Sequence, residues 1–267
     1  MTAAEGRPAE TGRAREPRVE VHQALVTSAE ARGCAGLLDA VERGRAARLP
    51  APAAARFTVA RGLLRTVLSA RLGLPPARVP LVAHCPGCGA AGHGPVRLAD
   101  DAPERDSAAG QDAAHVPEWT LSVAHSGILV AVAVGHRAGA LGVDVETAER
   151  AEDIEALAPR LLGPVHRERL AALPAPARRA ALLRVWTGAE SYAKATGTGL
   201  GHALAGVRAT VDARGRVRVA APEEPAGWSV RSVPARAPGY AAAVTVRRGA
   251  RVHTRPRSRP HIGRTPG

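Results

Sequence analysis

The hydrophobic period of this chain changes twice from helical to alternating, and this double change limits the folds that it can adopt. Apolar residues recur at helical spacing over residues 31–49, 53–74, 153–173 and 175–197. Alternating or continuously apolar segments, typical of strands, occupy residues 119–127, 128–135, 140–147, 202–222 and 228–248. Helices followed by strands, twice in succession, predict an α+β fold with two similar halves. The short segment 135–140 is interpreted as a hairpin connection between two of the strands.

These patterns also set the expected domain boundaries. Residues 1–19 are expected to be flexible, 20–137 to form the N-terminal half and 138–247 the C-terminal half. Residues 248–267 hold six of the arginines, three prolines and no acid, which predicts a disordered tail. A loop-rich section is expected from residue 75 to residue 117.

The segment "LGVDVET" places two carboxylates on one side of a predicted strand. Val143 and Val145 alternate with Asp144 and Glu146, and residues two apart on a strand point to the same face. Neighbouring like charges repel one another unless a cation lies between them, and Mg²⁺ prefers oxygen ligands. The alternative for this strand alone is a solvated edge strand with its polar face in water.

The segment "RVWTGAESYAKATGTGL" contains Lys194, the single lysine among 37 basic residues. It is interpreted as a helix that ends at Gly197, on which Glu190 and Lys194 share a face. Trp186 lies one turn before Glu190, so this face is expected to begin in the core. The alternative is a surface ion pair, in which arginine would serve as well. Lysine differs from arginine where a compact ammonium must fit beside a phosphate.

Together, "LGVDVE" and "WTGAESYAKATGTGL" resemble the paired signature of the 4′-phosphopantetheinyl transferases of the surfactin-type (Sfp-type) class. "LSVAHSG" and the arginine-rich "ARFTVARGLLRTVL" are similar to two further elements of that family, and the similarity covers roughly residues 35–245. The resemblance implies two similar α/β subdomains related by a pseudo-two-fold axis, each an antiparallel sheet packed with helices. It also implies a monomer, because the two halves form a pseudo-dimer within one chain.

The resemblance further implies an activity. This is the Mg²⁺-dependent transfer of 4′-phosphopantetheine from coenzyme A to a serine of an apo acyl or peptidyl carrier protein. The products would be the holo-carrier protein and adenosine 3′,5′-bisphosphate. Such a reaction depends on positioning and electrostatics, so it requires no protein nucleophile.

The implied roles divide among three groups of residues. The Mg²⁺ ligands would be Asp144, Glu146 and Glu190. The catalytic residues would be Glu190 and Lys194. Glu190, or a metal-bound water beside it, would be the base that accepts the serine proton, and Lys194 would also contact a coenzyme A phosphate. The other coenzyme A contacts would be His125, Arg43 and Arg56.

Three positions depart from the family pattern. Ala189 stands where the family has a lysine, Ala124 stands where it has a serine, and Gly94–Pro95 lacks the neighbouring lysine, for which Arg97 is a candidate substitute. Each lost charged hydrogen bond predicts weaker coenzyme A binding by roughly 1–3 kcal/mol. An impaired family member that acts as a coenzyme A or carrier-protein binding module therefore stays open as the alternative function.

The segment "HCPGCGAAGH" carries a C-x-x-C pair, Cys85 and Cys88, with His84 and His93 nearby. Zinc usually takes four ligands, commonly from two such pairs, and the sequence has no second pair. A zinc site, a redox pair and a compact loop over the cofactor entrance are the three interpretations.

Charge and composition narrow the remaining classes of function. The net charge of +13 favours anionic partners. Six of these charges are the arginines of residues 248–267, and the remaining, modestly basic body lacks the interleaved aromatic residues and the basic stripe of a nucleic-acid reader. Nucleic acid is therefore not expected as a partner, and a nucleic-acid-binding protein driven by the arginine tail is the least favoured hypothesis. The N-terminus has no apolar signal region, and no segment is long enough to span a membrane. We expect a cytoplasmic protein without a membrane partner.

Overall fold

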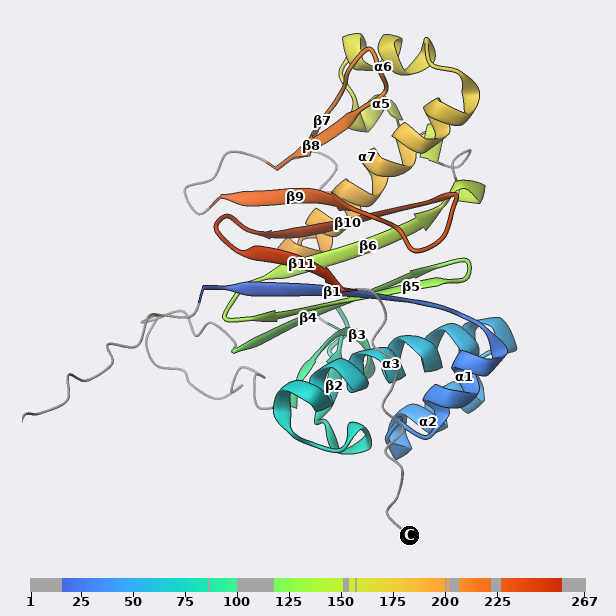
Figure 1. Ribbon diagram of the computed structural model, residues 1–267, viewed down its shortest axis with the longest axis vertical. Coiled ribbons are helices and arrows are strands. Elements are labelled where there is room, and N and C mark those ends of the chain that lie inside the picture. Colours follow the sequence, from blue (N-terminus) through green and yellow to red (C-terminus); the bar gives the residue numbers. More distant parts are fainter. Residues whose placement is uncertain are drawn as a thin grey trace, which may run out of the picture.

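Two sheets are stacked between helices in the computed structural model (Figure 1). The structure describes residues 16–85, 87–99, 118–150, 154–156, 158–199, 201, 207–221 and 227–255. Its helices are α1 (Ser28–Ala35), α2 (Ala40–Arg48), α3 (Ala51–Leu72), α5 (Ala158–Leu161), α6 (Pro164–Ala171) and α7 (Ala175–Thr196), with 3₁₀ turns η1 (Pro76–Arg78) and η3 (Ala148–Arg150). None of these described helices combines the length and apolar character needed to cross a membrane.

The strands form two main sheets and two hairpins. The first sheet has the order β11 (Arg251–Arg255), β1 (Arg18–Leu25), β5 (Leu129–His136) and β4 (Trp119–Ser126). The second has the order β6 (Leu141–Thr147), β10 (Tyr240–Arg247) and β9 (Trp228–Val233). The hairpins are β2 (Leu81–His84) with β3 (Ala91–Leu98), and β7 (Arg208–Val211) with β8 (Val217–Ala220). All pairs except β1 with β11 are antiparallel, which confirms the predicted α+β class.

The long helices α3 and α7 occupy matching places in the two halves. Each has 22 residues, begins after a proline and ends at a glycine in the left-handed conformation, Gly73 or Gly197, both with φ of 67°. Left-handed glycine is a common end for a helix because it carries no Cβ penalty. Both helices are also preceded and opened by the same residues, Leu-Pro-Ala-Pro-Ala at 49–53 and 173–177. This short internal repeat supports the division into two similar halves.

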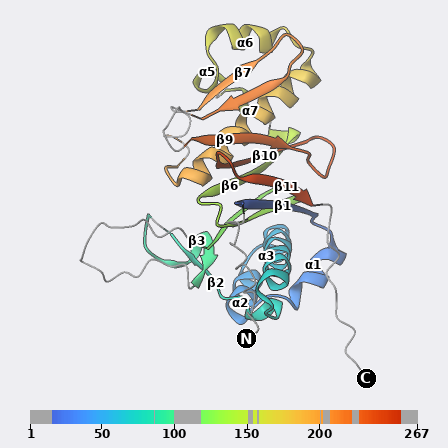
Figure 2. The same ribbon diagram turned by 60° about the vertical axis from the view of Figure 1, so that its left-hand side comes forward.

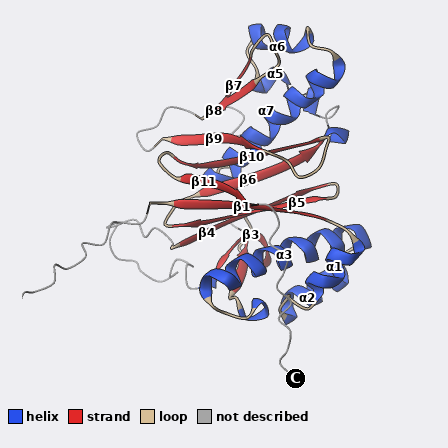
Figure 3. Ribbon diagram, in the orientation of Figure 1, coloured by secondary structure: helices blue, strands red, loops and turns tan. Residues whose placement is uncertain are grey.

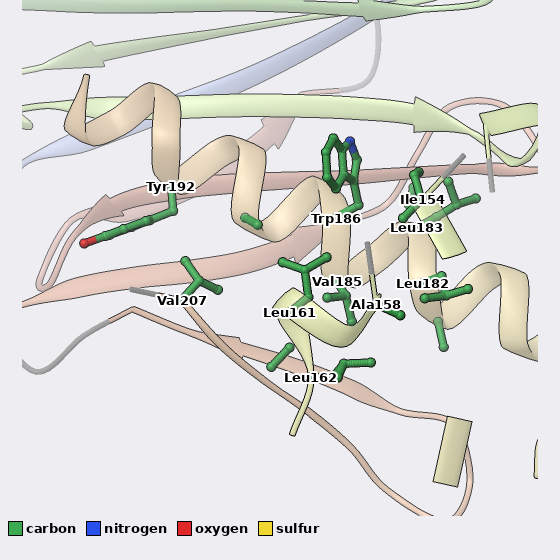
Figure 4. Close-up of a cluster of buried hydrophobic side chains, with 14 of the residues drawn as sticks. Ile154, Ala158, Leu161, Leu162, Leu182, Leu183, Val185, Trp186, Tyr192 and Val207 are labelled. Carbon is green, nitrogen blue, oxygen red and sulfur yellow. The ribbon is translucent and has the colours of Figure 1, made fainter. Parts of the chain in front are cut away.

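The core lies in layers that follow from strand alternation. On β5, Val130, Val132 and Val134 join the cluster that packs against α3, whereas Leu129, Ala131 and Ala133 join the cluster between the two sheets. The strand is buried on both faces, which explains its continuously apolar sequence. A third cluster surrounds α7, where Trp186, Val185 and Tyr192 pack among neighbouring side chains (Figure 4).

Three expectations from the sequence need correction. Segment 135–140 is not a hairpin, because β5 pairs with β1 and β4 whereas β6 begins the other sheet beside β10. The predicted loop section contains the β2–β3 hairpin. The tail that was expected to be disordered from residue 248 instead contains β11, which pairs with β1. This exposed edge strand is held by main-chain pairing rather than by apolar side chains, so it has no apolar period.

The proposed N-terminal boundary also shifts, since β1 begins at Arg18 rather than after residue 19. Residues 1–15, 100–117 and 256–267, where flexible, loop and tail segments were predicted, lie outside the described residues. Figure 3 shows the two main sheets between a group of helices with the β2–β3 hairpin at one end and a group with the β7–β8 hairpin at the other. This arrangement leaves β4 and β6 to form the junction between the halves.

Candidate active site

The site forms where β6 lies against α7. Gly142 on β6 allows the contact, because a Cβ at this position would lie 2.1 Å from the Ser191 carbonyl oxygen and 2.5 Å from the Ala195 nitrogen. No side chain fits at such distances, so the strand and the helix approach more closely than any other residue would permit. This close approach sets Asp144, two residues further along β6, opposite Lys194.

Asp144 and Lys194 form a direct ion pair. Lys194 Nζ donates to Asp144 Oδ1 at 2.8 Å, and Asp144 is only 4% exposed. Burial raises the pKa of Asp144 to about 7, Lys194 opposes that rise, and the charges of Glu190 and Glu146 add to it. The second carboxylate oxygen, Oδ2, is buried without a hydrogen-bond partner in the structure. The site thus holds negative charge that its own residues neutralise only in part.

Serine hydroxyls on β4 connect the two sheets beside this pair. Ser126 Oγ donates to Glu146 Oε2 at 2.6 Å, and Ser122 Oγ accepts the Val143 amide at 3.0 Å. Since β4 and β6 have no ladder of backbone hydrogen bonds in the described sheets, these side-chain bonds fix their relative position. Glu146 is thereby directed toward the junction between the halves, with Arg150 Nη1 4.0 Å from its other oxygen.

Glu190 lies close enough to Lys194 and Glu146 for their charges to shift its pKa. Burial raises the pKa of Glu190, Lys194 opposes the rise, and Glu146 contributes to it. The predicted alternation in "LGVDVET" holds for three residues, because Val143 and Val145 lie in the core between the sheets while Asp144 contacts Lys194 on α7. Trp186 is buried at the start of the helix face that carries Glu190, also as predicted.

The three acids offer a suitable donor set for a hard divalent cation. The partnerless Oδ2 of Asp144 and the mutual repulsion among the three carboxylates are the features that a cation would satisfy. Among the described residues, however, no three His, Cys, Asp or Glu side chains stand together in a metal-binding group. The residues present fit the ion by chemistry, and the ligand assignment remains a prediction.

A cavity of about 520 Å³ opens beside Glu190 and Lys194. It lies between the two halves, and its lining comes from α2, α3, β3, β4 and α7. Glu190, Ala193, Lys194 and Gly197 share the α7 face that borders it, since residues three and four apart on a helix are neighbours. The opposite face of the helix, with Tyr192 and Val185, packs into the core (Figure 4).

The predicted coenzyme A contacts separate into two groups. His125 lines the cavity, and withdrawal from water together with the charges of Arg56 and Lys194 lowers the pKa of His125. Arg56 is therefore close enough to His125 to act on it electrostatically, although it does not line the cavity. Arg43 lies outside the lining and donates to the Leu38 carbonyl oxygen, so its predicted role as a cofactor contact has no support from its position.

Sequence reasoning missed three residues of the cavity wall. Phe57, the single phenylalanine of the chain, lies between Arg45 and Arg61, whose guanidinium carbons are 4.9 and 5.5 Å from its ring centroid. All three line the cavity. Phe57 and Arg61 are four apart on α3, a signal that the sequence carried, but Arg45 enters from α2 and only the tertiary structure places it there.

The structure shows where the residues that depart from the family pattern lie. Ala189 is fully buried in the core cluster around α7, so the missing lysine removes no group from the cavity wall. Ala124, Gly94 and Pro95 do line the cavity. Arg97, the candidate substitute for the loop lysine, does not belong to the lining, and its Nε is buried without a hydrogen-bond partner in the structure.

The two-sheet α+β fold thus places an acid–lysine pair beside a cavity that Arg45, Arg61 and Lys194 line. Residues 140–245 match the family model of the 4′-phosphopantetheinyl transferase superfamily. Over 145 residues the chain is also 30% identical to the 4′-phosphopantetheinyl transferase HetI of Nostoc sp. strain PCC 7120. That alignment spans 54% of this chain and 53% of the relative, about half of each. The matched segment, residues 140–245, is thus similar to the 4′-phosphopantetheinyl transferase superfamily, in agreement with the resemblance seen in the sequence.

Proposed function

We propose that this chain transfers the 4′-phosphopantetheine group of coenzyme A to a serine of an acyl or peptidyl carrier protein. The observation that carries this proposal is the contact between Lys194 and buried Asp144 at one side of a cavity between the two halves. One cavity wall is basic and aromatic, with Arg45, Phe57 and Arg61. The other wall holds Glu190 and Lys194, so groups that bind anions and a group that accepts protons line the same cavity.

Coenzyme A would lie along this cavity with its phosphates toward the cationic groups. Arginine guanidinium groups bind phosphate strongly through charge-assisted hydrogen bonds. Lys194, as a compact ammonium on α7, would donate to a phosphate oxygen close to the reacting bond. His125 has a lowered pKa, so at neutral pH it would act as a neutral hydrogen-bonding group rather than as a cation.

Glu190 would accept the proton of the attacking serine. Burial raises its pKa toward the operating pH, which is the condition for an efficient general base. Its place on the α7 face that borders the cavity would bring the carboxylate to the nucleophile. Loss of the proton would leave the serine oxygen free to attack the β-phosphate, and adenosine 3′,5′-bisphosphate would depart.

Asp144, Glu146 and Glu190 would hold a Mg²⁺ ion. When bound, such an ion supplies charge neutralisation at the pyrophosphate. The Ser126 hydroxyl would keep Glu146 oriented, because it already donates to that carboxylate at 2.6 Å. Lys194 would keep Asp144 in place through its contact with Oδ1 at 2.8 Å.

The pairing of two similar halves in one chain supports the Sfp-type class and a monomeric state. The remaining positive charge would favour carrier proteins that are acidic around the serine, through electrostatic steering. The two arginines of β11 that lie near acidic side chains are less available to bind nucleic acid. Arg251 pairs with Glu16, and Arg255 lies 3.7 Å from Glu20.

The test is incubation of the full chain with coenzyme A, Mg²⁺ and apo carrier proteins of fatty acid, polyketide and nonribosomal peptide type, followed by intact mass measurement. At least one carrier should gain one phosphopantetheine group. Glu190→Gln should abolish the gain, whereas Glu168→Gln, an exposed acid on α6, should leave it unchanged. Coenzyme A binding without transfer to any carrier would reject the enzyme and support the alternative, a binding module.

A further inference from the structure

The end of the β2–β3 hairpin carries a pair of thiols that the transfer reaction does not use. Cys85 follows β2 and is half-buried, while Cys88 lies three residues later and is exposed. Neither is in a disulfide, and the third cysteine, Cys34, is buried under α3. Figure 2 shows the hairpin extending from the side of the molecule beside α2 and α3. The pair is therefore open to solvent on a segment that reaches the cavity.

Backbone hydrogen bonds hold the two thiols on one tight turn. The Gly89 amide donates to the Cys85 carbonyl oxygen at 2.8 Å, and the Cys85 amide donates to the Ala90 carbonyl oxygen at 3.0 Å. Gly89 has φ of 70°, which closes the turn without the strain that a side chain would cause. Within this turn the Cys85 sulfur accepts hydrogen bonds from the Cys88 and Gly87 amides and from the Cys88 thiol. The turn thus brings Cys88 within hydrogen-bonding reach of the Cys85 sulfur.

These hydrogen bonds stabilise the thiolate of Cys85. The Cys88 amide contributes most and the Gly87 amide next, and together they hold the pKa of the Cys85 thiol below its ordinary range. A thiolate, not a thiol, is the species that attacks a disulfide. Cys85 is accordingly the attacking sulfur and Cys88 the one that resolves.

The same turn is packed against the wall of the cavity. A Cβ on Gly94 would lie 2.4 Å from the His84 carbonyl oxygen and 2.7 Å from the Cys85 Cα, so the two backbone segments are in direct contact. Gly94 lines the cavity beside Pro95. Arg45, also in the cavity wall, donates to the Gly92 carbonyl oxygen of the hairpin. A change in the conformation of the turn would therefore move both Gly94 and the partner of Arg45.

We propose that Cys85 and Cys88 are a reversible dithiol site that small-molecule disulfides oxidise, and that closure of the Cys85–Cys88 disulfide weakens coenzyme A binding in the adjacent cavity. The exchange stands on the geometry of the turn and on the stabilised Cys85 thiolate. Only its effect on coenzyme A rests on the proposed function.

The exchange balances in two steps. The Cys85 thiolate attacks one sulfur of a disulfide RSSR, which forms a mixed disulfide at Cys85 and releases RS⁻. The Cys88 thiolate then attacks the Cys85 sulfur, forms the intramolecular disulfide and releases the second RS⁻. The protein gives up two electrons and two protons, and the small disulfide is reduced to two thiols.

A zinc site is the competing use of these cysteines. In the described part of the chain, no group of three or more His, Cys, Asp or Glu side chains is assembled around a common point. The pair alone supplies two of the four ligands that structural zinc requires. His84 precedes Cys85, and its Nδ1 is buried without a hydrogen-bond partner in the structure, so metal content is the measurement that decides between a dithiol and a zinc site.

The first experiment measures the thiols of the full chain. After reduction, timed alkylation with iodoacetamide at pH 7 and peptide mass mapping should show Cys85 reacting at least about tenfold faster than Cys34, the buried reference. Incubation with oxidised glutathione should remove two hydrogens and protect Cys85 and Cys88 together. Cys88→Ser should instead retain one glutathione on Cys85. Equal rates at Cys85 and Cys34, absence of the internal disulfide, or one zinc per chain that Cys88→Ser loses would each overturn the dithiol site.

The second experiment measures coenzyme A binding by calorimetry on the reduced and oxidised chain. The oxidised form should bind at least about fivefold more weakly, dithiothreitol should restore the affinity, and Cys85→Ser/Cys88→Ser should not respond to oxidised glutathione. Equal affinity in the two forms would overturn the effect on the cavity. Absence of coenzyme A binding in both forms would overturn the proposed function, while the thiol measurements would still decide the exchange.

Discussion

Lys194 Nζ lies 2.8 Å from Asp144 Oδ1, and this contact joins the two sequence segments that first indicated the function of the chain. Asp144 is almost fully buried, whereas the Lys194 side chain is 34% exposed. The lysine therefore reaches the carboxylate from the cavity side. Its single positive charge is close to three acids, Asp144, Glu146 and Glu190.

Replacement of Asp144 should show what its burial costs the fold. The pKa of Asp144 is raised to about 7, so between about pH 4 and pH 7 the folded chain keeps a proton that the unfolded chain has lost. This group therefore favours folding at low pH, and its contribution is lost as the pH rises through 7. We expect metal-free Asp144→Asn to exceed the wild type in free energy of unfolding by about 1–2 kcal/mol at pH 8.

The same variant should lose its stability advantage near pH 4.5 and should have no transferase activity at any pH. Urea denaturation in the presence of EDTA at several pH values gives the comparison. If the difference in free energy of unfolding between the two proteins stayed constant between pH 4.5 and pH 8, the raised pKa of Asp144 would be contradicted.

Lys194→Arg should reduce transfer although the charge is retained. A planar guanidinium is larger than an ammonium, and the close contact of β6 with α7 at Gly142 leaves little room for it beside Asp144. We expect kcat/KM to fall by at least about tenfold. Arg184→Lys, an exposed position on the same helix, is the matched control. Unchanged kinetics in Lys194→Arg would leave the single lysine without a functional explanation.

Gly142→Ala should damage both stability and activity. The new Cβ would clash with the backbone of α7 at Ser191 and Ala195, so the helix must move away from β6. We expect the free energy of unfolding to fall by about 2–4 kcal/mol. Gly33→Ala on α1, where a Cβ meets nothing within 4 Å, should instead stabilise by roughly 0.5–1 kcal/mol. Similar effects at the two glycines would exclude close packing as the reason for Gly142.

Arg45 and Arg43 lie two residues apart on α2 and should behave differently. Arg45 lines the cavity and stacks on Phe57, whereas Arg43 is exposed and bonds within its own segment. Calorimetry should show Arg45→Ala weakening coenzyme A binding by about tenfold or more, with little change for Arg43→Ala. The reverse order would restore the role that the sequence alone assigned to Arg43.

Arg65 should matter to the fold rather than to the cofactor. Its fully buried guanidinium bonds Glu42 at 2.5 Å, Asp39, and the carbonyl oxygens of Pro76 and Val79. Arg65→Met would remove the cation that Asp39 and Glu42 share, and we expect a loss of about 3–5 kcal/mol in thermal or urea unfolding. Arg71→Met breaks a more exposed pair with Glu20 and should cost no more than about 1 kcal/mol. A small effect at Arg65 would contradict its structural role.

Local sequence patterns predicted the positions of several residues of the candidate site. The alternation in "LGVDVET" correctly separated the core-facing valines from Asp144, and helical spacing correctly joined Trp186, Glu190 and Lys194 on one face. Both follow from backbone geometry within a few residues. The matched starts of α3 and α7 were also readable in the sequence, yet so short a repeat gains meaning only when two helices of equal length are seen in equivalent places.

Pairings between distant segments could not be predicted in the same way. Strand β11 has no apolar period because it is an edge strand held by main-chain bonds to β1, and β6 leaves β5 for the other sheet because its partner β10 lies about a hundred residues later. Arg45 rather than Arg43 reaches the cavity because the docking of α2 on α3 decides which side of that helix faces inward. The sequence by itself determined the long helices α3 and α7, the strands from β4 to β10 and the acid–lysine chemistry that they carry. Only the tertiary structure decided which arginines and which thiols stand beside it, because those contacts depend on how separate elements pack.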